Sequence, residues 1–143
     1  MAPLTQKELY GLIGYPVKHS YSAFMHNAAF AHYHMNAEYQ LFEVSPEKLE
    51  EFFKKTIFEK KIKGFNVTVP HKEAAVQYLD GICSEGVKVN GAVNTILVEK
   101  DGKLSGFNTD GPGFSRDLNE HHVVVKGKRI ALLGAGGDRK SVV

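Results

Sequence analysis

The sequence predicts an α/β fold: a mainly parallel open sheet with helices on both faces. Short runs of alternating or continuous apolar residues, typical of strands, follow one another along the chain, and segments with apolar residues at helical spacing separate them. This alternation favours right-handed crossovers between parallel strands. With 143 residues, 43% hydrophobic and 24% charged, the chain has the size and composition of one soluble domain.

The first elements are a strand, a helix and a second strand. Residues 8–16 form a short buried run closed by Gly14 and Pro16. A helix is predicted to start near Tyr21, because three apolar residues recur at helical intervals. These are Phe24, Ala28 and Ala31. Alternation over residues 37–44 predicts the second strand.

A longer helix and a third strand follow. Ser45 and Pro46 mark a helix start, with a side-chain cap followed by proline at the first helical position. This helix is predicted to reach Lys60, and its lysines lie on the solvent face. The face predicted to be buried consists of Leu49, Phe52, Phe53 and Ile57. Residues 62–69 then alternate as a strand that ends at Pro70.

The second half is predicted to contain a helix from Pro70 to about Asp80, with Cys83 as a small buried residue in a helix. Residues 91–111 form two extended runs joined by a turn at residues 100–102, a hairpin that makes one pairing antiparallel. A helix over residues 111–122 follows. Residues 128–137 are predicted to be a strand that leads into a glycine loop.

Composition excludes several classes of function. A formal net charge of +2 is too small to favour nucleic acid, and no apolar run approaches the roughly 20 residues that span a bilayer. A single cysteine and an N-terminus without a signal-peptide core favour the cytoplasm. Adjacent or alternate histidines point to different helix faces, so we expect no metal site. The pairs in question are His32 with His34 and His121 with His122.

Polar residues gather at the predicted strand ends. They are Ser20 and Ser22 after the first strand, Thr68 and Lys72 after the third, and Asn94, Asn108, Thr109 and Asp110 around the hairpin. The carboxyl ends of strands in an open α/β sheet share one edge, where ligands usually bind. We therefore expect these side chains to converge on one cleft that suits a small, oxygen-rich, anionic ligand.

Each of these residues also has a purely structural interpretation. Ser20 and Ser22 could cap the following helix, Thr68 could be an ordinary strand residue, and Lys72 could be a solvated surface lysine. Residues 108–110 could make local backbone bonds in a turn. Their joint occurrence at consecutive strand ends favours the shared cleft.

Four motifs resemble, in order and spacing, the substrate-domain motifs of shikimate dehydrogenases. They are "GYPVKHSYSAFMHNAAF", "GFNVTVPHK", "GAVNT" and "GFNTDGPGF". "LLGAGG" resembles the first strand and loop of that family's Rossmann-like NADP-binding domain. The resemblance covers about residues 9–137. It implies a substrate domain over residues 1–110, a connecting helix over 111–127 and the start of a nucleotide domain over 128–143.

The resemblance also implies an activity and roles for single residues. The activity is the reversible reduction of 3-dehydroshikimate to shikimate with NADPH, in the pathway to chorismate and aromatic amino acids. Ser20, Ser22 and Thr68 would hold the shikimate carboxylate, and Asn94 the ring hydroxyls. Lys72 and Asp110 would be the catalytic pair, because an amine can move the proton of the reacting hydroxyl while a carboxylate orients it. His71 is expected to point elsewhere. The loop that would bind NADP is Gly134, Ala135, Gly136 and Gly137.

The sequence departs from the family pattern at three places. Ala23 stands where proline usually follows the second serine, and Asn90 stands where an apolar residue is common. Asp138 replaces the usual alanine of the nucleotide loop, beside Arg139, and would oppose a phosphate unless the arginine compensates.

The chain ends at Val143, before the rest of a nucleotide domain. We therefore expect it to be inactive alone, and to self-associate through apolar residues near Phe114, Leu118 and residues 130–133. Two alternative functions remain: a non-catalytic module that binds a shikimate-like acid, and a quinate/shikimate dehydrogenase of broader specificity. Lys72 and Asp110 favour an enzyme over a non-catalytic module. Ser20 and Ser22 favour shikimate selectivity over the broader specificity of a quinate/shikimate dehydrogenase.

Overall fold

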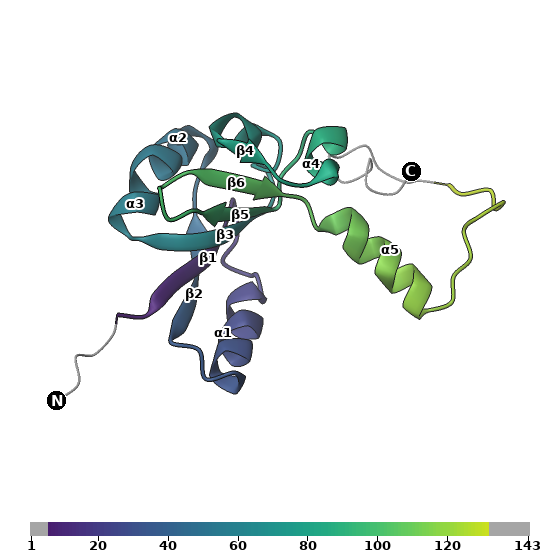
Figure 1. Ribbon diagram of the computed structural model, residues 1–143, viewed down its shortest axis with the longest axis horizontal. Coiled ribbons are helices and arrows are strands. Elements are labelled where there is room, and N and C mark those ends of the chain that lie inside the picture. The colour runs from purple at the N-terminus through teal and green to yellow at the C-terminus, as the bar shows by residue number, and fades with distance from the viewer. Residues whose placement is uncertain (1–5, 132–143) are drawn as a thin grey trace.

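The computed structural model of the chain describes residues 6–131. It contains a six-stranded sheet in the order β2-β1-β3-β5-β6-β4, with helices on both faces (Figure 1). One half of the sheet consists of β1 (Glu8–Gly14), β2 (Ala37–Glu43) and β3 (Ile62–Val67). β1 pairs in parallel with both of its neighbours, as the alternation of strands and helices predicts.

The other half of the sheet contains the predicted hairpin. β5 (Thr95–Val98) and β6 (Leu104–Phe107) are antiparallel, and their turn includes Gly102 at φ +86°. β5 also runs antiparallel to β3, while β4 (Gly81–Ile82) pairs in parallel with β6. The antiparallel pairing of the predicted hairpin is confirmed, but the sequence does not predict a second one. The hairpin inserts between β3 and β4, so that β5 also has β3 as an antiparallel neighbour. The sheet is nevertheless mostly parallel.

A continuous helical segment covers one face of the sheet. It comprises η1 (Pro46–Lys48), α2 (Leu49–Glu51), η2 (Phe52–Thr56) and α3 (Ile57–Glu59), so its predicted bounds are confirmed. Ser45 occupies the N-cap position but makes no side-chain cap bond. All four residues of the predicted apolar face are buried.

The middle of that segment, η2, is a π turn, and it places two successive phenylalanines on the sheet. Phe52 and Phe53 both pack edge-on against Phe65 of β3, with ring centroids 5.5 and 5.8 Å apart. A π turn winds more residues into each turn than an α turn, so neighbouring side chains diverge less. These rings form the centre of the larger core.

The second, smaller core lies on the opposite face, under α1 (Ser22–His32). Leu12, Val17 and Tyr39 are buried there, and Phe30 of the helix packs against them. Because side chains alternate along a strand, Leu12 enters this core while Ile13 enters the larger one. Helices on both faces, as predicted, are confirmed.

The segment between β3 and β5 differs from the prediction. In place of a helix from Pro70 to Asp80 there is a short 3-10 helix, η3 (Ala74–Tyr78), and β4 and α4 (Glu85–Asn90) are unpredicted. Residues 68–75 form turns, in which the His71 N–H donates to Thr68 O and the Ala75 N–H to His71 O. These turns bring Lys72 O to the Val93 N–H at 2.8 Å, a tertiary bond that local periodicity does not reveal.

The prediction for Cys83 is also wrong. The residue is exposed and follows β4, outside any helix. Val87 and Asn90, one helix later, take the buried positions. The small size of Cys83 does not lead to burial, because the residue follows β4, which is an edge strand of the sheet.

The last described element is α5 (Asp110–Glu120), which projects from the body of the fold (Figure 1). It confirms the helix predicted after the hairpin. Residues 128–131 contain no strand. The rest of the predicted strand, the glycine loop Gly134–Gly137, Asp138 and Arg139 lie outside the described residues. None of the described helices is long and apolar enough to span a bilayer.

The aromatic core suggests a matched pair of variants. Phe53→Ala should lower the free energy of unfolding by about 3–5 kcal/mol, the usual cost of removing a buried phenyl ring, because this side chain is 2% exposed. Phe58→Ala on the same helical segment, where the ring is 48% exposed, should cost far less. Urea denaturation followed by circular dichroism measures both. Equal losses would contradict the proposed core.

Candidate functional site

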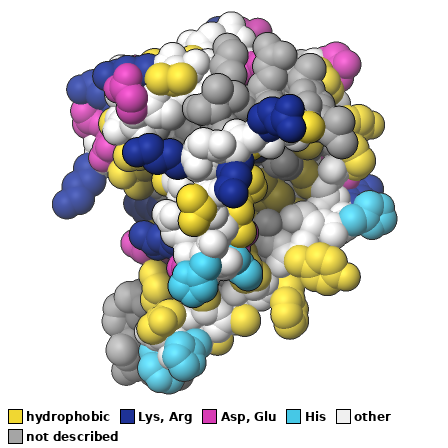
Figure 2. All heavy atoms as spheres, turned by 90° about the vertical axis from the view of Figure 1, so that its right-hand side faces the viewer, with side chains coloured by type: hydrophobic (Ala, Val, Ile, Leu, Met, Phe, Trp, Pro, Cys, Tyr) yellow, Lys and Arg dark blue, Asp and Glu magenta, His cyan; other side chains and the backbone are white. Residues whose placement is uncertain are grey.

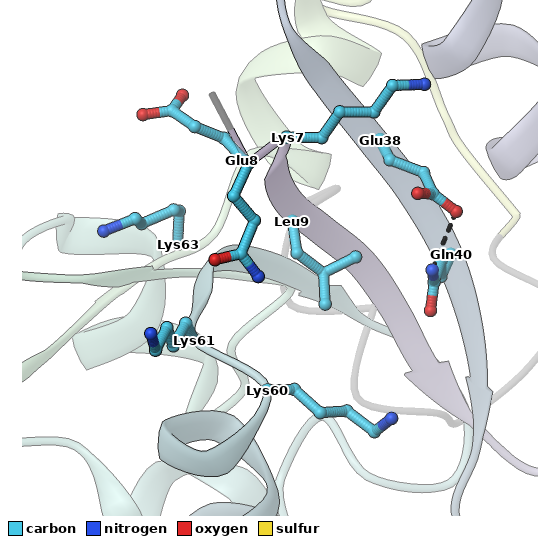
Figure 3. Close-up of a pocket in the computed structure, with 9 residues that line it drawn as sticks. Lys7, Glu8, Leu9, Glu38, Gln40, Lys60, Lys61 and Lys63 are labelled. Carbon is cyan, nitrogen blue, oxygen red and sulfur yellow. Dashed lines mark hydrogen bonds between the residues drawn. The ribbon is translucent and has the colours of Figure 1, made fainter. Parts of the chain in front are cut away.

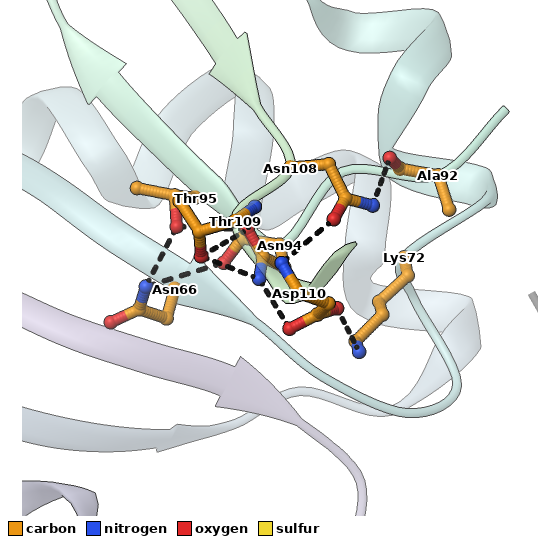
Figure 4. Close-up of polar contacts among 8 residues, drawn as sticks. All are labelled: Asn66, Lys72, Ala92, Asn94, Thr95, Asn108, Thr109 and Asp110. Atoms are coloured by element: carbon orange, nitrogen blue, oxygen red, sulfur yellow. Dashed lines mark hydrogen bonds and ion pairs between the residues drawn. The ribbon is translucent and has the colours of Figure 1, made fainter. Parts of the chain in front are cut away.

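Three predicted site residues meet at one edge of the sheet. Lys72 follows β3, Asn94 immediately precedes β5, and Asp110 begins α5 just beyond β6. Lys72 Nζ lies 2.8 Å from Asp110 Oδ2, and Asn94 Nδ2 donates to Asp110 Oδ1 at 2.6 Å (Figure 4). One carboxylate therefore joins an ammonium group and a carboxamide, each on its own oxygen.

Backbone hydrogen bonds hold these three segments together. The Val93 N–H donates to Lys72 O, the Asn94 N–H to Phe107 O, and the Val67 N–H to Asn94 O. The segment that carries Asn94 is thus bonded to both strands that flank β5 in the sheet, to β3 through Val67 and to β6 through Phe107. The side chains meet because the main chain is already in register.

The orientation of the Asn94 carboxamide follows from its partners. Its Oδ1 lies 3.0 Å from the backbone N–H of Thr109, which can only donate, so this atom is the oxygen. The Thr95 hydroxyl, also at 3.0 Å, donates to the same oxygen. Nδ2 therefore faces the Asp110 carboxylate and the Thr109 hydroxyl, the latter at 2.9 Å.

Asn108 has a structural role, as the local interpretation predicts. The side chain is buried, its Nδ2 donates to Ala92 O at 2.9 Å, and its Oδ1 accepts the Asp110 N–H at 3.0 Å. It thereby positions the first residue of α5. Asp110 itself is different, because its carboxylate reaches across to Lys72.

The two predicted serines contact each other at the start of α1. The Ser20 hydroxyl donates to Ser22 Oγ at 3.0 Å and accepts the Ser22 N–H at 3.2 Å. Ser20 therefore also bonds the first backbone N–H of the helix, which is part of the capping interpretation. The two hydroxyls lie close enough to serve one ligand group.

Thr68 directly follows β3 and contacts the end of β1, the strand that precedes the serine pair. Its N–H donates to Ile13 O, and its methyl group lies against Gly14 at the end of β1. A side chain at Gly14 would meet that methyl at 2.5 Å, so the approach requires glycine. Thr68 and the serines thus follow the carboxyl ends of two adjacent parallel strands.

The side of the molecule on which α5 projects has an uneven surface. Figure 2 shows histidine and hydrophobic side chains exposed on it. Among the described residues no hydrogen bond joins the serine pair to the Lys72 cluster. The structure therefore assembles Lys72, Asn94 and Asp110 as one cluster and Ser20 with Ser22 as another.

His71 points away from Lys72, as predicted. Its ring is 1% exposed, and Nε2 lies 2.6 Å from Val44 O in the core. His71 therefore has a structural role and holds the turn against the end of β2. The adjacent Lys72 contacts Asp110 instead.

A separate hollow of about 380 Å³ lies at the opposite, amino-terminal edge of the parallel strands (Figure 3). It is lined by Gln6, Lys7, Glu8, Leu9, Glu38, Gln40, Lys60, Lys61 and Lys63. None of the predicted site residues lines it, so the strand-end argument and this hollow concern different edges of the sheet.

Sequence reasoning missed part of the polar network around the cluster. Thr95 bonds the Asn94 side chain directly, and Tyr39 bonds Asn66 across the sheet. Thr109, which the sequence does place among the polar strand-end residues, also bonds Asn94, and Asn66 joins Tyr39 to Thr95. Thr95 and Asn66 lie within the quoted motifs, which was a usable signal. Tyr39 carries no signal, because a tyrosine in an alternating strand usually belongs to the core.

Among the described residues, no group of three or more His, Cys, Asp or Glu side chains could hold a metal ion. His32 and His34 are both exposed. The positive charge beside Asp110 is the Lys72 ammonium group, at 2.8 Å.

With this geometry established, the family is decided by a match to the model of the shikimate dehydrogenase substrate binding domain over residues 12–96. The chain belongs to the shikimate dehydrogenase family. The NADP(+) shikimate dehydrogenase of Caldanaerobacter subterraneus is 47% identical over 135 residues, which are 94% of this chain and 47% of that protein. The chain spans about half the length of the curated relatives it matches.

Solved structures show the same fold. The shikimate dehydrogenase of Aquifex aeolicus is 44% identical with a TM-score of 0.89, and the match covers 96% of this chain and 51% of that one. The enzyme of Thermus thermophilus in complex with NADP(H) and shikimate is 36% identical with a TM-score of 0.83, covering 94% and 50%. Both structures support the mostly parallel α/β architecture described above.

Two departures from the family's sequence pattern are accommodated by the fold. α1 begins at Ser22 without the usual proline, and Ala23 packs partly buried against the smaller core. Asn90 is buried at the end of α4, next to Gly91 at φ +66°.

Tyr39 gives a pH-dependent prediction. Burial raises the pKa of its phenol well above the ordinary value of about 10. The folded protein therefore favours the neutral phenol, and this contribution to stability is complete below pH 10 and is lost as pH rises further. Tyr39→Phe should flatten the fall in unfolding free energy above pH 10, which is about 1.4 kcal/mol per pH unit for one proton.

Urea unfolding at pH 8 to 11 measures this slope. Tyr33→Phe, at an exposed position next to α1, is the matched control and should keep the wild-type slope. Part of the slope should remain in Tyr39→Phe, because burial and Glu8 also raise the pKa of Tyr10. Identical slopes in the two variants would contradict the role of Tyr39.

Proposed function

We propose that the whole protein is an NADP-dependent shikimate dehydrogenase, which reversibly reduces 3-dehydroshikimate to shikimate. The observation that carries the proposal is the contact of Lys72 with Asp110, at 2.8 Å on the edge where the strands end. The relatives named above carry the name shikimate dehydrogenase, and the Thermus thermophilus structure is a complex with NADP(H) and shikimate.

In this proposal Lys72 transfers the proton, and Asp110 orients the Lys72 ammonium group. On reduction the ammonium group donates a proton to the carbonyl oxygen as that carbon accepts a hydride; on oxidation the amine takes the proton back. Lys72 is suited to this role because its side chain is 19% exposed and is held by a carboxylate. NADP(H), which Gly134, Ala135, Gly136 and Gly137 would help to bind, supplies or accepts the hydride.

The remaining residues would hold the substrate. Ser20, Ser22 and Thr68 offer hydroxyls for the carboxylate of shikimate, and the mutual contact of the two serines supports a shared ligand. Asn94 would bind ring hydroxyls from its place between Asp110 and Thr109. The pathway to chorismate and aromatic amino acids, and a cytoplasmic location consistent with one free cysteine, belong to the same proposal.

Two alternatives from the sequence remain distinct from this function. A non-catalytic module that binds a shikimate-like acid is disfavoured by the ion pair, since a binder needs no proton donor at the hydroxyl. A quinate/shikimate dehydrogenase of broader specificity would share the same cluster. Comparison of the two acids as substrates of the whole protein separates it from a shikimate-selective enzyme.

We also propose the domain division 1–110, 111–127 and 128–143. The projection of α5 from the sheet in Figure 1 supports a boundary near residue 110. Apolar side chains beyond that boundary are exposed, including Phe114 at 42%, Val124 at 68% and Ile130 at 61%. We propose that they pair with the same surface of a second copy.

Self-association can be checked by sedimentation of this chain at increasing concentration. The wild type should shift toward a dimer, because exposed apolar area drives association. Val124→Lys should oppose the shift by placing a charge in the interface. Lys126→Arg, two residues away, keeps the charge and is the control. A monomer at every concentration would contradict the proposal.

Binding variants test the proposed site. Lys72→Met should weaken shikimate binding to this chain roughly 10- to 100-fold, because a charge-assisted hydrogen bond is worth about 1.5–3 kcal/mol. Ser22→Ala should also weaken it, by up to about the same factor, since the lost hydrogen bond is to the charged carboxylate of shikimate. Lys54→Met, on the solvent face of the helix at residues 46–59, is the control and should bind as wild type. Titration followed by NMR measures the dissociation constants.

The same variants in the whole protein separate binding from chemistry. Lys72→Met should abolish most of kcat, whereas Ser22→Ala should mainly raise KM for shikimate. A Lys72→Met enzyme with wild-type kcat would overturn the catalytic assignment, and wild-type protein that does not bind shikimate would overturn the function.

A further inference from the structure

A row of polar side chains crosses the α1 face of the sheet and ends at the Lys72 cluster. Tyr39 lies on β2, Asn66 on β3 and Thr95 on β5. Asn66 and Thr95 are directly paired in the antiparallel ladder, so their side chains point to the same face. A core surface of this kind normally carries apolar residues, and here three strands each contribute a hydrogen-bonding group.

The hydrogen bonds between them form an unbroken chain. The Tyr39 hydroxyl donates to Asn66 Oδ1 at 2.7 Å, and Asn66 Nδ2 donates to Thr95 Oγ1 at 3.0 Å. Thr95 Oγ1 then donates to Asn94 Oδ1 at 3.0 Å. From Asn94 the chain continues to Asp110 and Lys72, as Figure 4 shows from Asn66 onward.

The direction of this chain is determined by its neighbours. Asn66 Nδ2 also lies 3.3 Å from the backbone carbonyl of Asn94, which can only accept, so Asn66 Oδ1 must face the Tyr39 hydroxyl. Asn94 is oriented by the backbone N–H of Thr109. With both carboxamides oriented, the Thr95 hydroxyl has a single arrangement: it accepts from Asn66 and donates to Asn94.

The far end of the chain is anchored by α1. The His26 ring stacks on Tyr39 with centroids 4.2 Å apart, and Asn27 bonds both the N–H and the C=O of Tyr39 at 2.9 Å. Tyr39 is 4% exposed. The helix that begins with Ser22 is thus connected, through Tyr39, to the residues around Lys72.

We propose that Thr95 is a positioning residue for the catalytic cluster, and that Tyr39 and Asn66 support it from across the sheet. Thr95 acts through Asn94: its hydroxyl fixes the carboxamide so that Nδ2 points at Asp110, and Asp110 in turn holds Lys72. Carboxamide links do not pass protons along, so the chain orients groups and carries no proton. The proposal rests on the proposed function, since the cluster is its catalytic centre.

The cost of losing one link follows from the geometry. Without the Thr95 hydroxyl, Asn94 Oδ1 keeps the Thr109 N–H, so the carboxamide is less constrained but not released. Asn66 Nδ2 loses its closer acceptor at the same time. Successive hydrogen bonds in such a network polarise one another, so the loss should weaken the hydrogen bond from Asn94 Nδ2 to Asp110.

The test uses an isosteric pair at one position. Thr95→Val keeps the shape and the β-branch but removes the hydroxyl, while Thr95→Ser keeps the hydroxyl. Shikimate binding should weaken about 5- to 10-fold in Thr95→Val and stay within about 2-fold of wild type in Thr95→Ser, the difference expected for one hydrogen bond. The side-chain amide NMR signals of Asn94 should shift in Thr95→Val alone, with or without shikimate.

A merely structural role predicts a different result. Thr95→Val would then lower the unfolding free energy in urea while leaving the Asn94 amide signals and the dissociation constant unchanged, and this would overturn the proposal. Tyr39→Phe is a second, milder variant if Thr95→Val does not fold. It should weaken binding about 2- to 5-fold. Where Thr95→Val folds, combining it with Tyr39→Phe should cost less than the sum of the two single losses, because both changes break one chain.

The Asn94 signals also separate this proposal from the proposed function. If wild-type protein does not bind shikimate, the function fails, but the Asn94 shift still tests the network. If wild-type protein binds shikimate and Thr95→Val matches it in affinity and in the Asn94 signals, the network proposal fails and the function stands.

Discussion

The carboxamide of Asn94 is the group on which the candidate site depends. Its oxygen accepts from the Thr109 backbone and the Thr95 hydroxyl, and its nitrogen donates to Asp110. A carboxamide can satisfy both kinds of partner because it has a donor and an acceptor at fixed positions. An aspartate at this position would face the Asp110 carboxylate with a like charge, and an alanine would remove the acceptor of the Thr109 N–H and of the Thr95 hydroxyl.

The hairpin insertion explains how this group reaches its partners. Because β5 enters the sheet antiparallel to β3, its first residue lies at the edge where β3 ends. β6 runs back to the same edge, so Asp110 emerges beside Asn94. The two antiparallel pairings, one of them unforeseen, place the start of one strand and the ends of two others together.

The sequence predicted the elements with strong local signals and the residues of the cluster. The buried helix face of Leu49, Phe52, Phe53 and Ile57, the hairpin and the orientation of His71 away from the predicted site are confirmed. The helix after Pro70 and the burial of Cys83 are wrong. In both cases local composition resembled a helix, whereas tertiary bonds such as Val93 N–H to Lys72 O decided the conformation.

Sequence alone determined which chemical groups are available at the strand ends, because residue type and strand periodicity are local properties. The tertiary structure decided which of them touch: Lys72 with Asp110, Ser20 with Ser22, and Tyr39 with Asn66 across the intervening β1. Those contacts depend on strand order and register, which arise from packing between segments far apart in the chain. The row from Tyr39 to Thr95 exists only through that register.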